Sequence, residues 1–128
     1  MDLKTRISNF MTEEPATISE EASLHEAFEL MKEKKIHHLP VVSDTDLVGI
    51  LSDRDLRITE LMPDASKITV GDLMTPNPYT AAHDLETKTV IGEMLKRKCG
   101  CAIILNAKCH VAGIFTQFDA LKLLYEKL

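Results

Sequence analysis

The sequence has no tryptophan, only 5% aromatic residues and only three cysteines among its 128 residues. Three cysteines make no disulfide framework, and a domain of this length buries about two thirds of its unfolded surface without one. No apolar run approaches the roughly 18 residues of a membrane-spanning helix, and the N-terminus lacks the apolar segment of a secretory signal. We therefore expect a globular protein of the reducing cytoplasm, neither secreted nor inserted in a membrane.

A basic run is also missing. The 15 lysines and arginines are outnumbered by 20 acidic residues, which gives a net charge of -5 and argues against nucleic acid as a partner. The sequence contains no Gly-rich phosphate loop and no Gly-x-Ser-x-Gly elbow. Asp53 and Asp55 lie near Ser52, but on one helix turn with no base directed at a nucleophile. We expect no enzymatic activity, no metal and no required cofactor.

What the sequence does contain is a tandem repeat. FMTEEPATI at 10–18 matches LMTPNPYTA at 73–81 with an offset of 63, and GILSDRD at 49–55 matches GIFTQFD at 113–119 with an offset of 64. Two matched blocks in the same order indicate two copies of one module. The predicted repeats are 1–63 and 68–128, joined by a linker from Pro63 to about Lys67.

Both copies predict the order β-α-β-β-α and hence an α+β fold. In the first copy, Ser23 and Glu26 form a helix-start capping box, and Leu24, Ala27, Phe28 and Met31 share one helical face. Continuous apolar runs predict buried strands that pair as hairpins with the strands after them. The predicted segments are extended 16–18, strands 39–42 and 47–51 and a helix from Asp53, then a helical face of Thr87, Val90, Ile91, Met94 and Leu95, strands 102–105 and 110–115 and a helix from Gln117.

The repeated pattern Gly-Ile-x-Ser/Thr-x-x-Asp falls where a strand turns into a helix. One interpretation is structural: Ser52 and Thr116 cap helices, and Asp55 and Asp119 complete the capping boxes. The other is a ligand site, because a helix start and a hydroxyl suit phosphate, and a carboxylate can accept both hydroxyls of a ribose. Aspartate in place of the usual glutamate favours the ligand.

Together, these motifs resemble a stand-alone tandem pair of cystathionine-β-synthase-type (CBS) domains over essentially the whole chain. The resemblance rests on the Met-Thr turns, on 15–17 and 37–42, and on the two Gly-to-Asp motifs. It implies a regulatory module that binds AMP, ADP, ATP or S-adenosylmethionine in two clefts between repeats packed by their sheets. It also implies a homodimer that signals to a protein target in trans.

By this resemblance, the aspartates hold the ribose and the hydroxyl residues contact phosphate. Arg54 adds a charge-assisted contact with phosphate in the first copy, where the second copy has Phe118. Which repeat contributes each wall of a cleft stays open. The candidate nucleotide-binding residues are Thr17, His38, Leu39, Pro40, Ser52, Arg54 and Asp55, and then Thr80, Cys101, Ala102, Ile103, Thr116 and Asp119.

The alternative is an interaction module without a nucleotide. Its basis is the last helix, whose apolar face is wider than one module needs; that face comprises Phe118, Leu121, Leu124, Tyr125 and Leu128. A zinc site of Cys99, Cys101, Cys109 and His110 is less favoured, because its spacing is unusual and free cysteine packs well in cores. Of His37 and His38, one is expected to flank a cleft and the other to face solvent or a helix.

Overall fold

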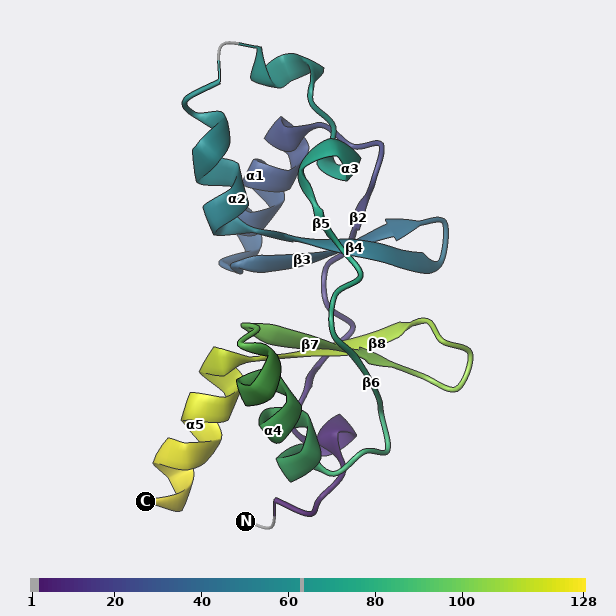
Figure 1. Ribbon diagram of the computed structural model, residues 1–128, viewed down its shortest axis with the longest axis vertical. Coiled ribbons are helices and arrows are strands. Elements are labelled where there is room, and N and C mark those ends of the chain that lie inside the picture. The colour runs from purple at the N-terminus through teal and green to yellow at the C-terminus, as the bar shows by residue number, and fades with distance from the viewer. Residues whose placement is uncertain (1–2, 63) are drawn as a thin grey trace. The chain divides into compact units, whose positions relative to one another are not determined.

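The computed structural model describes residues 3–62 and 64–128, and the chain forms two compact units (Figure 1). Unit 1 joins Met1–Pro15 to Tyr79–Leu128, and unit 2 is the continuous segment Ala16–Pro78. The compact units therefore do not follow the predicted repeats, because the segment from Leu3 to Pro15 folds with the second copy. The repeat limits stay a prediction about the sequence, and the proposed linker residue Pro63 lies outside the described residues.

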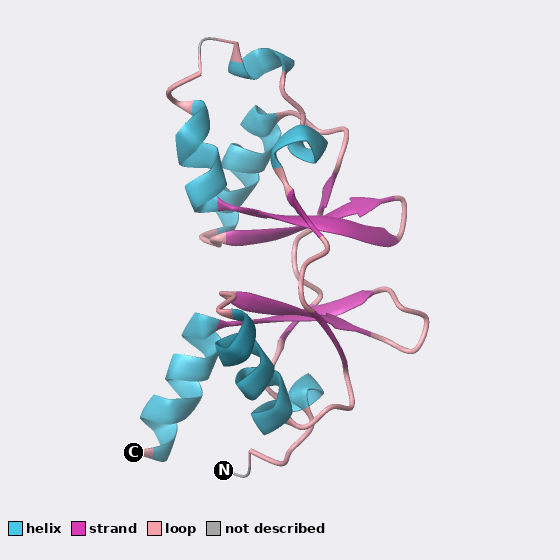
Figure 2. Ribbon diagram, viewed as in Figure 1, coloured by secondary structure: helices cyan, strands magenta, loops and turns pink. Residues whose placement is uncertain are grey.

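Unit 2 packs its helices on one face of a four-stranded sheet (Figure 2). The strand order is β2-β3-β4-β5, with β2 and β3 parallel and the other pairs antiparallel. This arrangement contains the predicted β-α-β-β-α order and adds a fourth strand to it. The elements are β2 Ile18–Ser19, α1 Leu24–Lys34, β3 His38–Ser43, β4 Asp46–Ser52, α2 Asp53–Thr59, a 3-10 turn Ala65–Lys67, α3 Val70–Leu73 and β5 Thr75–Pro76.

Unit 1 repeats the plan with a sheet of order β1-β8-β7-β6 (Figure 1). Its fourth strand, β1, comes from the start of the chain and pairs antiparallel with β8. The two Met-Thr segments, interpreted from sequence as turns, therefore lead into edge strands that complete the sheets. The elements are a 3-10 turn Ile7–Asn9, β1 Thr12–Glu13, β6 Thr80–Ala82, α4 Thr87–Arg97, β7 Cys101–Leu105, β8 Val111–Thr116 and α5 Gln117–Lys127.

The helix starts follow local sequence signals only in part. At α1, Ser23 caps the helix by accepting a hydrogen bond from the backbone N–H of Glu26 at 3.1 Å. Among the described residues, no hydrogen bond joins the Glu26 side chain to the backbone N–H of Ser23, so the predicted capping box is half formed. At α4, the carbonyls of Thr5 and Leu3 accept from the N–H groups of Thr87 and Lys88 at 2.9 and 2.8 Å. The N-terminal segment thus caps a helix more than 80 residues away in the chain.

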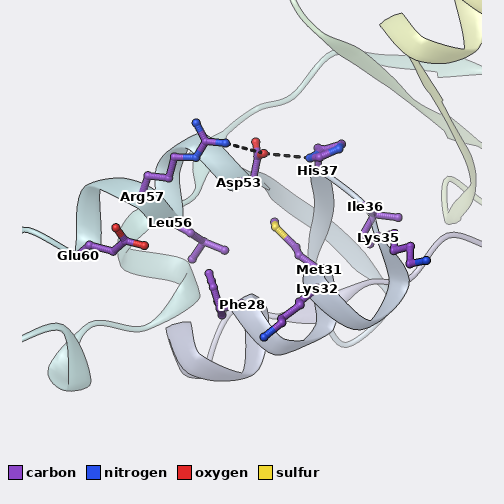
Figure 3. A pocket seen from close by; sticks show the side chains of 10 residues that line it. All are labelled: Phe28, Met31, Lys32, Lys35, Ile36, His37, Asp53, Leu56, Arg57 and Glu60. Atoms are coloured by element: carbon purple, nitrogen blue, oxygen red, sulfur yellow. Dashed lines mark hydrogen bonds and ion pairs between the residues drawn. The ribbon is translucent and has the colours of Figure 1, made fainter.

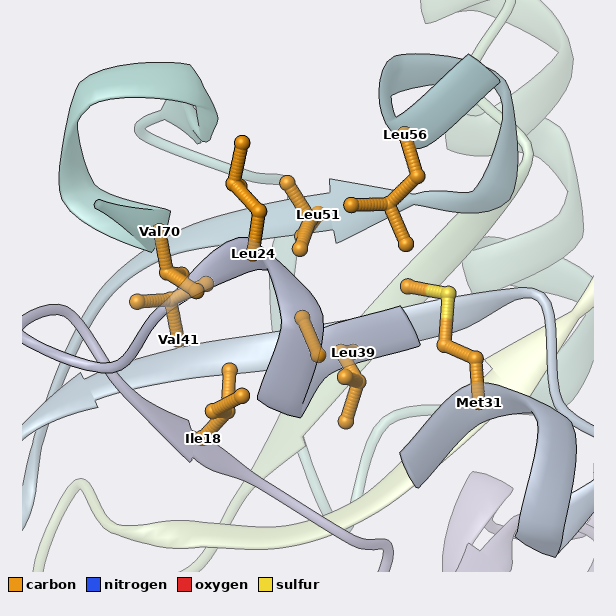
Figure 4. Close-up of a cluster of buried hydrophobic side chains, with 9 residues drawn as sticks. Ile18, Leu24, Met31, Leu39, Val41, Leu51, Leu56 and Val70 are labelled. Carbon is orange, nitrogen blue, oxygen red and sulfur yellow. The ribbon is translucent and has the colours of Figure 1, made fainter. Parts of the chain in front are cut away.

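Each unit has its own hydrophobic core between sheet and helices, and Figure 4 shows that of unit 2. The predicted helical faces are confirmed at Leu24, Ala27 and Met31, and again at Thr87, Val90 and Met94. Phe28, which is 46% exposed, and Leu95, which is also exposed, lie beside these residues but outside the cores. The cores are Ile18, Leu24, Ala27, Met31, Leu39, Val41, Leu51, Leu56 and Val70 in unit 2, and Ile7, Ala81, Val90, Met94, Ala102, Ile104, Phe115 and Leu123 in unit 1.

The repeated glycines of β4 and β8 make room for the crossing Met-Thr segments. A Cβ atom at Gly113 would collide with the Met11 side chain and lie 2.9 Å from the backbone oxygen of Thr12. Gly49 faces Met74 and Thr75 in the same way. The glycines and the methionines of the two sequence blocks are therefore partners in packing.

We expect Gly113→Ala to lower the free energy of unfolding by about 1–3 kcal/mol, as overpacking does. Gly92→Ala is the matched control, because no atom lies within 4 Å of a Cβ there and the residue sits inside α4. It should stabilise the protein by roughly 0.5–1 kcal/mol. Urea unfolding of both variants measures the difference, and an unchanged midpoint for Gly113→Ala would mean that β1 does not pack against β8 this closely.

Candidate functional site

In unit 2, the Ser52–Asp55 pair joins the end of β4 to the first turn of α2. Ser52 Oγ accepts a hydrogen bond from the backbone N–H of Asp55 at 3.2 Å, and Asp55 Oδ2 accepts one from the backbone N–H of Ser52 at 2.9 Å. Both side chains are half-buried. The predicted capping box is therefore present, and it fixes the orientation of the carboxylate.

In unit 1, Thr116 and Asp119 repeat this geometry at the start of α5. The two backbone bonds measure 3.2 and 2.9 Å, and the Thr116 hydroxyl lies a further 3.2 Å from Asp119 Oδ2. Each capping carboxylate uses Oδ2, and Oδ1 of Asp55 or Asp119 has no hydrogen bond within residues 3–62 and 64–128. One oxygen of each carboxylate thus remains an acceptor for a ligand.

A third box shows that capping alone does not mark a site. Thr69 caps α3, and Asp72 completes the box with bonds of 3.0 and 3.3 Å. Aspartate at this position is therefore a usual choice in this chain, whether or not a strand precedes the helix. The sequence argument that aspartate favours a ligand over a cap is weakened accordingly.

Strand pairing places one candidate of each copy directly opposite Ser52 or Thr116 and the others farther across or along the sheet. His38 lies opposite Ser52 and Pro40 opposite Ile50, while Thr17 immediately precedes β2, where Ile18 pairs with Val41. In unit 1, Cys101 lies opposite Thr116, and Thr80, Ile103 and Ile114 form one row across three strands. All candidates of one copy therefore belong to one compact unit.

Alternation along the strands separates the candidates by face. Leu39 and Ala102 are fully buried members of the cores, so their side chains point toward the helices. Their neighbours on either side, His38 with Pro40 and Cys101 with Ile103, point to the other face. Leu39 and Ala102 therefore have a packing role, and a contact with nucleotide stays a prediction for them.

Arg54 and Phe118 occupy equivalent positions just before the two aspartates. The side chain of Arg54 is exposed and makes no hydrogen bond or ion pair within the described part of the chain. Phe118 is also exposed, although it is a large apolar side chain. One copy thus presents a free cation next to its aspartate, and the other presents an aromatic ring.

The side chains opposite Ser52 and Thr116 are neutral groups at physiological pH. Burial lowers the pKa of His38, although the negative charge of Asp53 acts in the opposite direction. Burial raises the pKa of the Cys101 thiol to about 12. A bound anion therefore meets no positive imidazolium and no thiolate at these two positions.

The two histidines differ in exposure, with His38 half-buried and His37 facing solvent, and a place for either beside a nucleotide cleft stays a prediction. His37 is 75% exposed and its Nδ1 lies 2.9 Å from Asp53 Oδ2, which also lies 3.8 Å from Arg57 (Figure 3). Desolvation acts to raise the pKa of Asp53, but the hydrogen bond with His37 and the nearby positive charges outweigh it, and the pKa lies below its usual value. This contact joins the segment between α1 and β3, which contains His37, to the start of α2.

A pH dependence of stability follows from His38. Because the pKa of His38 is lowered in the folded state, the unfolded chain takes up the proton first as the pH falls below about 6.5. Proton uptake by the unfolded chain then lowers the free energy of unfolding. We expect the free energy of unfolding to fall between pH 7 and 5, and to fall less steeply in His38→Gln. Urea unfolding at several pH values checks this, with His25→Gln, at an exposed site, as the control. Equal slopes in wild type and His38→Gln would contradict it.

The zinc hypothesis gains no support from the geometry. No three His, Cys, Asp or Glu side chains of the described residues come together as a metal site requires. Cys101 is buried in β7, whereas Cys109 is exposed in the hairpin turn.

Among the described helices, none has the length and hydrophobicity to cross a membrane.

Comparison with known proteins gives a consistent result. The CBS domain family model matches residues 7–59 and again 70–126. The structure superposes on the CBS domain pair of protein MJ0100, in complex with 5'-methylthioadenosine and S-adenosyl-L-methionine, with a TM-score of 0.87, 27% identity and coverage of 97% of this chain and 98% of that one. It superposes on CBSX2 from Arabidopsis thaliana in complex with AMP with a TM-score of 0.81, 26% identity and coverage of 96% and 98%.

A curated relative, a homoserine O-acetyltransferase of Methanohalobium evestigatum, is 31% identical over 95% of this chain. The chain spans only 24% of the length of that protein, so the similarity concerns a module and not the enzyme's whole activity. The two family matches, the repeated β-α-β-β-α units and the structural neighbours agree. The chain belongs to the CBS domain family and contains two CBS domains in tandem.

Proposed function

We propose that this CBS pair is a regulatory sensor that binds an adenosine compound, such as AMP, ADP, ATP or S-adenosylmethionine. Binding would bias the chain between conformations and so change the activity of a protein partner in trans. In this proposal the chain acts without catalysis of its own and without a required cofactor.

The observation that carries the proposal is the repeated Ser/Thr–Asp pair with one uncommitted carboxylate oxygen. Asp55 and Asp119 are held rigidly by backbone bonds through Oδ2, which leaves Oδ1 as an acceptor of fixed direction. A ribose presents two neighbouring hydroxyl donors, which suits a preoriented carboxylate. Ser52 and Thr116 place a hydroxyl one turn away for a phosphate or other polar group.

The neighbours support the ligand class. The MJ0100 pair was solved with two adenosine derivatives, and CBSX2 was solved with AMP. At 26–27% identity over nearly the whole chain, they support an adenosine compound without selecting one. Arg54 favours a phosphorylated ligand in unit 2, and Phe118 favours an uncharged one in unit 1.

The proposal also includes a cellular location and an oligomeric state. We place the protein in the cytoplasm as a homodimer, in line with its three free cysteines and its exposed apolar helix face. The competing function is a dimerisation module without a ligand. It is favoured by the capping geometry, since Asp55 and Asp119 already have a structural role like that of Asp72.

Isothermal calorimetry with AMP, ADP, ATP and S-adenosylmethionine tests the proposal. We expect at least one of them to bind with a dissociation constant below 1 mM, the range of about -4 kcal/mol or stronger. GMP serves as the control for the base. Flat titrations with all four compounds would leave the ligand-free interaction module as the better description.

A further inference from the structure

A half-buried histidine lies next to the hydroxyl group of the candidate site in unit 2. His38 is directly opposite Ser52 in the antiparallel pair of β3 and β4. Residues opposite each other in such a pair have Cβ atoms about 4.5–5.5 Å apart, on the same face of the sheet. The imidazole of His38 therefore lies beside Ser52, at the point where β4 leads into α2 with its residues Arg54 and Asp55.

The groups around His38 leave its ring free to bind a ligand. The titratable groups that act on it are Asp53 and Asp55 from α2 and His37 from its own segment, and β2, on the other side of β3, has no titratable residue. Asp53 already bonds to His37 at 2.9 Å (Figure 3), and Asp55 accepts from the backbone N–H of Ser52 at 2.9 Å. Among the described residues, the imidazole of His38 has no hydrogen-bond partner.

A histidine in this position responds in opposite ways to charged and uncharged ligands. Burial lowers the pKa of His38 in the free protein, and an uncharged ligand that covers the side chain adds to this burial. An anion beside Ser52 has the reverse effect, because a negative charge within about 4–6 Å favours the imidazolium. The protonated ring can then donate a charge-assisted hydrogen bond to the anion.

From this placement we propose that His38 makes unit 2 selective for phosphorylated adenosine compounds, and that this selectivity increases with acidity. Binding of the phosphate takes up a proton at His38. Acidification below neutral pH therefore strengthens the binding of a phosphorylated compound and weakens the binding of adenosine. The inference rests on the proposed function and adds a pH-dependent charge to the fixed charge of Arg54.

Unit 1 is an internal comparison, because Cys101 takes the place of His38 and lies opposite Thr116. Burial raises the pKa of the Cys101 thiol to about 12, so the thiol stays neutral over the range in which a histidine titrates. Unit 1 also has Phe118 where unit 2 has Arg54. Its affinity for a ligand of constant charge should therefore not depend on pH in this range.

NMR titrations of the isotope-labelled chain at about pH 7.5 and 5.5 test the inference. The ligand is adenosine 5'-sulfate, which keeps a constant charge, whereas AMP would itself gain a proton because the second pKa of a phosphate is about 6. The amide shifts of Ser52 and Asp55 report the affinity of unit 2, and those of Thr116 and Asp119 report the affinity of unit 1.

We expect wild-type unit 2 to bind adenosine 5'-sulfate about three- to tenfold more tightly at the lower pH, with no change in unit 1. Adenosine should show the opposite trend in unit 2. The side-chain shifts of His38 give a direct readout, because its pKa should be higher in the protein saturated with adenosine 5'-sulfate than in the free protein.

Two variants isolate the contribution of His38. His38→Gln keeps a polar side chain without a titratable group, and its unit 2 affinity for adenosine 5'-sulfate should change by less than about twofold between the two pH values. His25→Gln, at an exposed position of α1, is the matched control and should behave like wild type. Circular dichroism verifies that each variant is folded at both pH values.

The outcomes separate this inference from the proposed function. Equal affinities of unit 2 at the two pH values, or the same pH dependence in His38→Gln as in wild type, would overturn the role of His38 and leave adenosine binding intact. A pH dependence of equal size in unit 1 would also overturn it, because Cys101 does not titrate there. Absence of saturable shifts at Ser52 and Asp55 at both pH values would overturn the site in unit 2 and the inference with it.

Discussion

Replacing Asp55 or Asp119 by alanine is expected to weaken binding of an adenosine compound by roughly 1.5–3 kcal/mol, or about 10- to 150-fold. The reason is the loss of a carboxylate whose Oδ1 is the preoriented acceptor for the ribose. The same change removes a helix-start contact and should cost only about 1 kcal/mol of stability. Calorimetry and urea unfolding of the same variants measure the two effects side by side.

Asp72→Ala is the matched control for this experiment. Asp72 completes a capping box of the same form at α3, outside the candidate residues of either copy. It should lower stability by a similar amount and leave affinity unchanged. If Asp55→Ala and Asp119→Ala behave like Asp72→Ala, with lower stability and intact binding, the aspartates are caps and the proposed site is wrong.

Ile7→Ala is expected to lower the free energy of unfolding of unit 1 by about 2–5 kcal/mol, the range for truncating a buried isoleucine. Ile7 is fully buried in the core formed by β7, β8 and the helices of unit 1, although it lies only six residues from the start of the chain. Two backbone hydrogen bonds hold this segment in place, because the N–H groups of Ile7 and Ser8 donate to the carbonyls of Leu85 and His83. Urea unfolding followed by circular dichroism measures the loss.

Two variants control for this effect. Val70→Ala, at the equivalent position of unit 2, removes a fully buried side chain from the other core and should also be destabilising. Leu61→Ala, at a residue 87% exposed, should change stability by less than about 0.5 kcal/mol. An Ile7→Ala variant as stable as Leu61→Ala would show that the N-terminal segment does not complete unit 1.

The features that the sequence predicted well are those set by neighbours in the chain. Ser52 and Asp55, or Thr116 and Asp119, are three residues apart, so their mutual bonds depend on little beyond the helix that begins there. The buried strands and their hairpins followed from continuous apolar runs joined by short turns. The helix starts at Asp53 and Gln117 were located correctly for the same reason.

The features that it missed depend on residues far apart. The pairing of Thr12 with Ile114 spans about a hundred residues, and a two-residue strand carries no periodic pattern. Ile7 and Val70 were not recognised as core residues, although their separation of 63 equals the repeat offset. The repeated glycines were a further sequence signal for the packing of the Met-Thr segments on the sheets. In the structure, Gly49 and Gly113 each face the methionine of such a segment.

Leu95 illustrates a different limit. Helical periodicity places Leu95 next to the core face of α4, but it does not distinguish a buried position from the exposed edge of a groove. Lys32, at the equivalent position of α1, shows that the repeated unit accepts a charged side chain there, so the leucine is not required for the core. The candidate ligand residues have the same limit, since a cap and a ligand contact use the same residue types.

The most direct test of ligand sensing is an NMR titration of the isotope-labelled protein with AMP and S-adenosylmethionine, in which backbone amide shifts are followed residue by residue. We predict that the amides of Ser52 and Asp55, of Thr116 and Asp119, or of both pairs shift with a saturable dependence on ligand, because they donate directly to the side chains proposed to bind ribose and phosphate. The amides of Thr69 and Asp72 should stay unchanged. Absence of saturable shifts at both Ser/Thr–Asp pairs, or equal shifts at Thr69 and Asp72, would contradict adenosine binding at these sites.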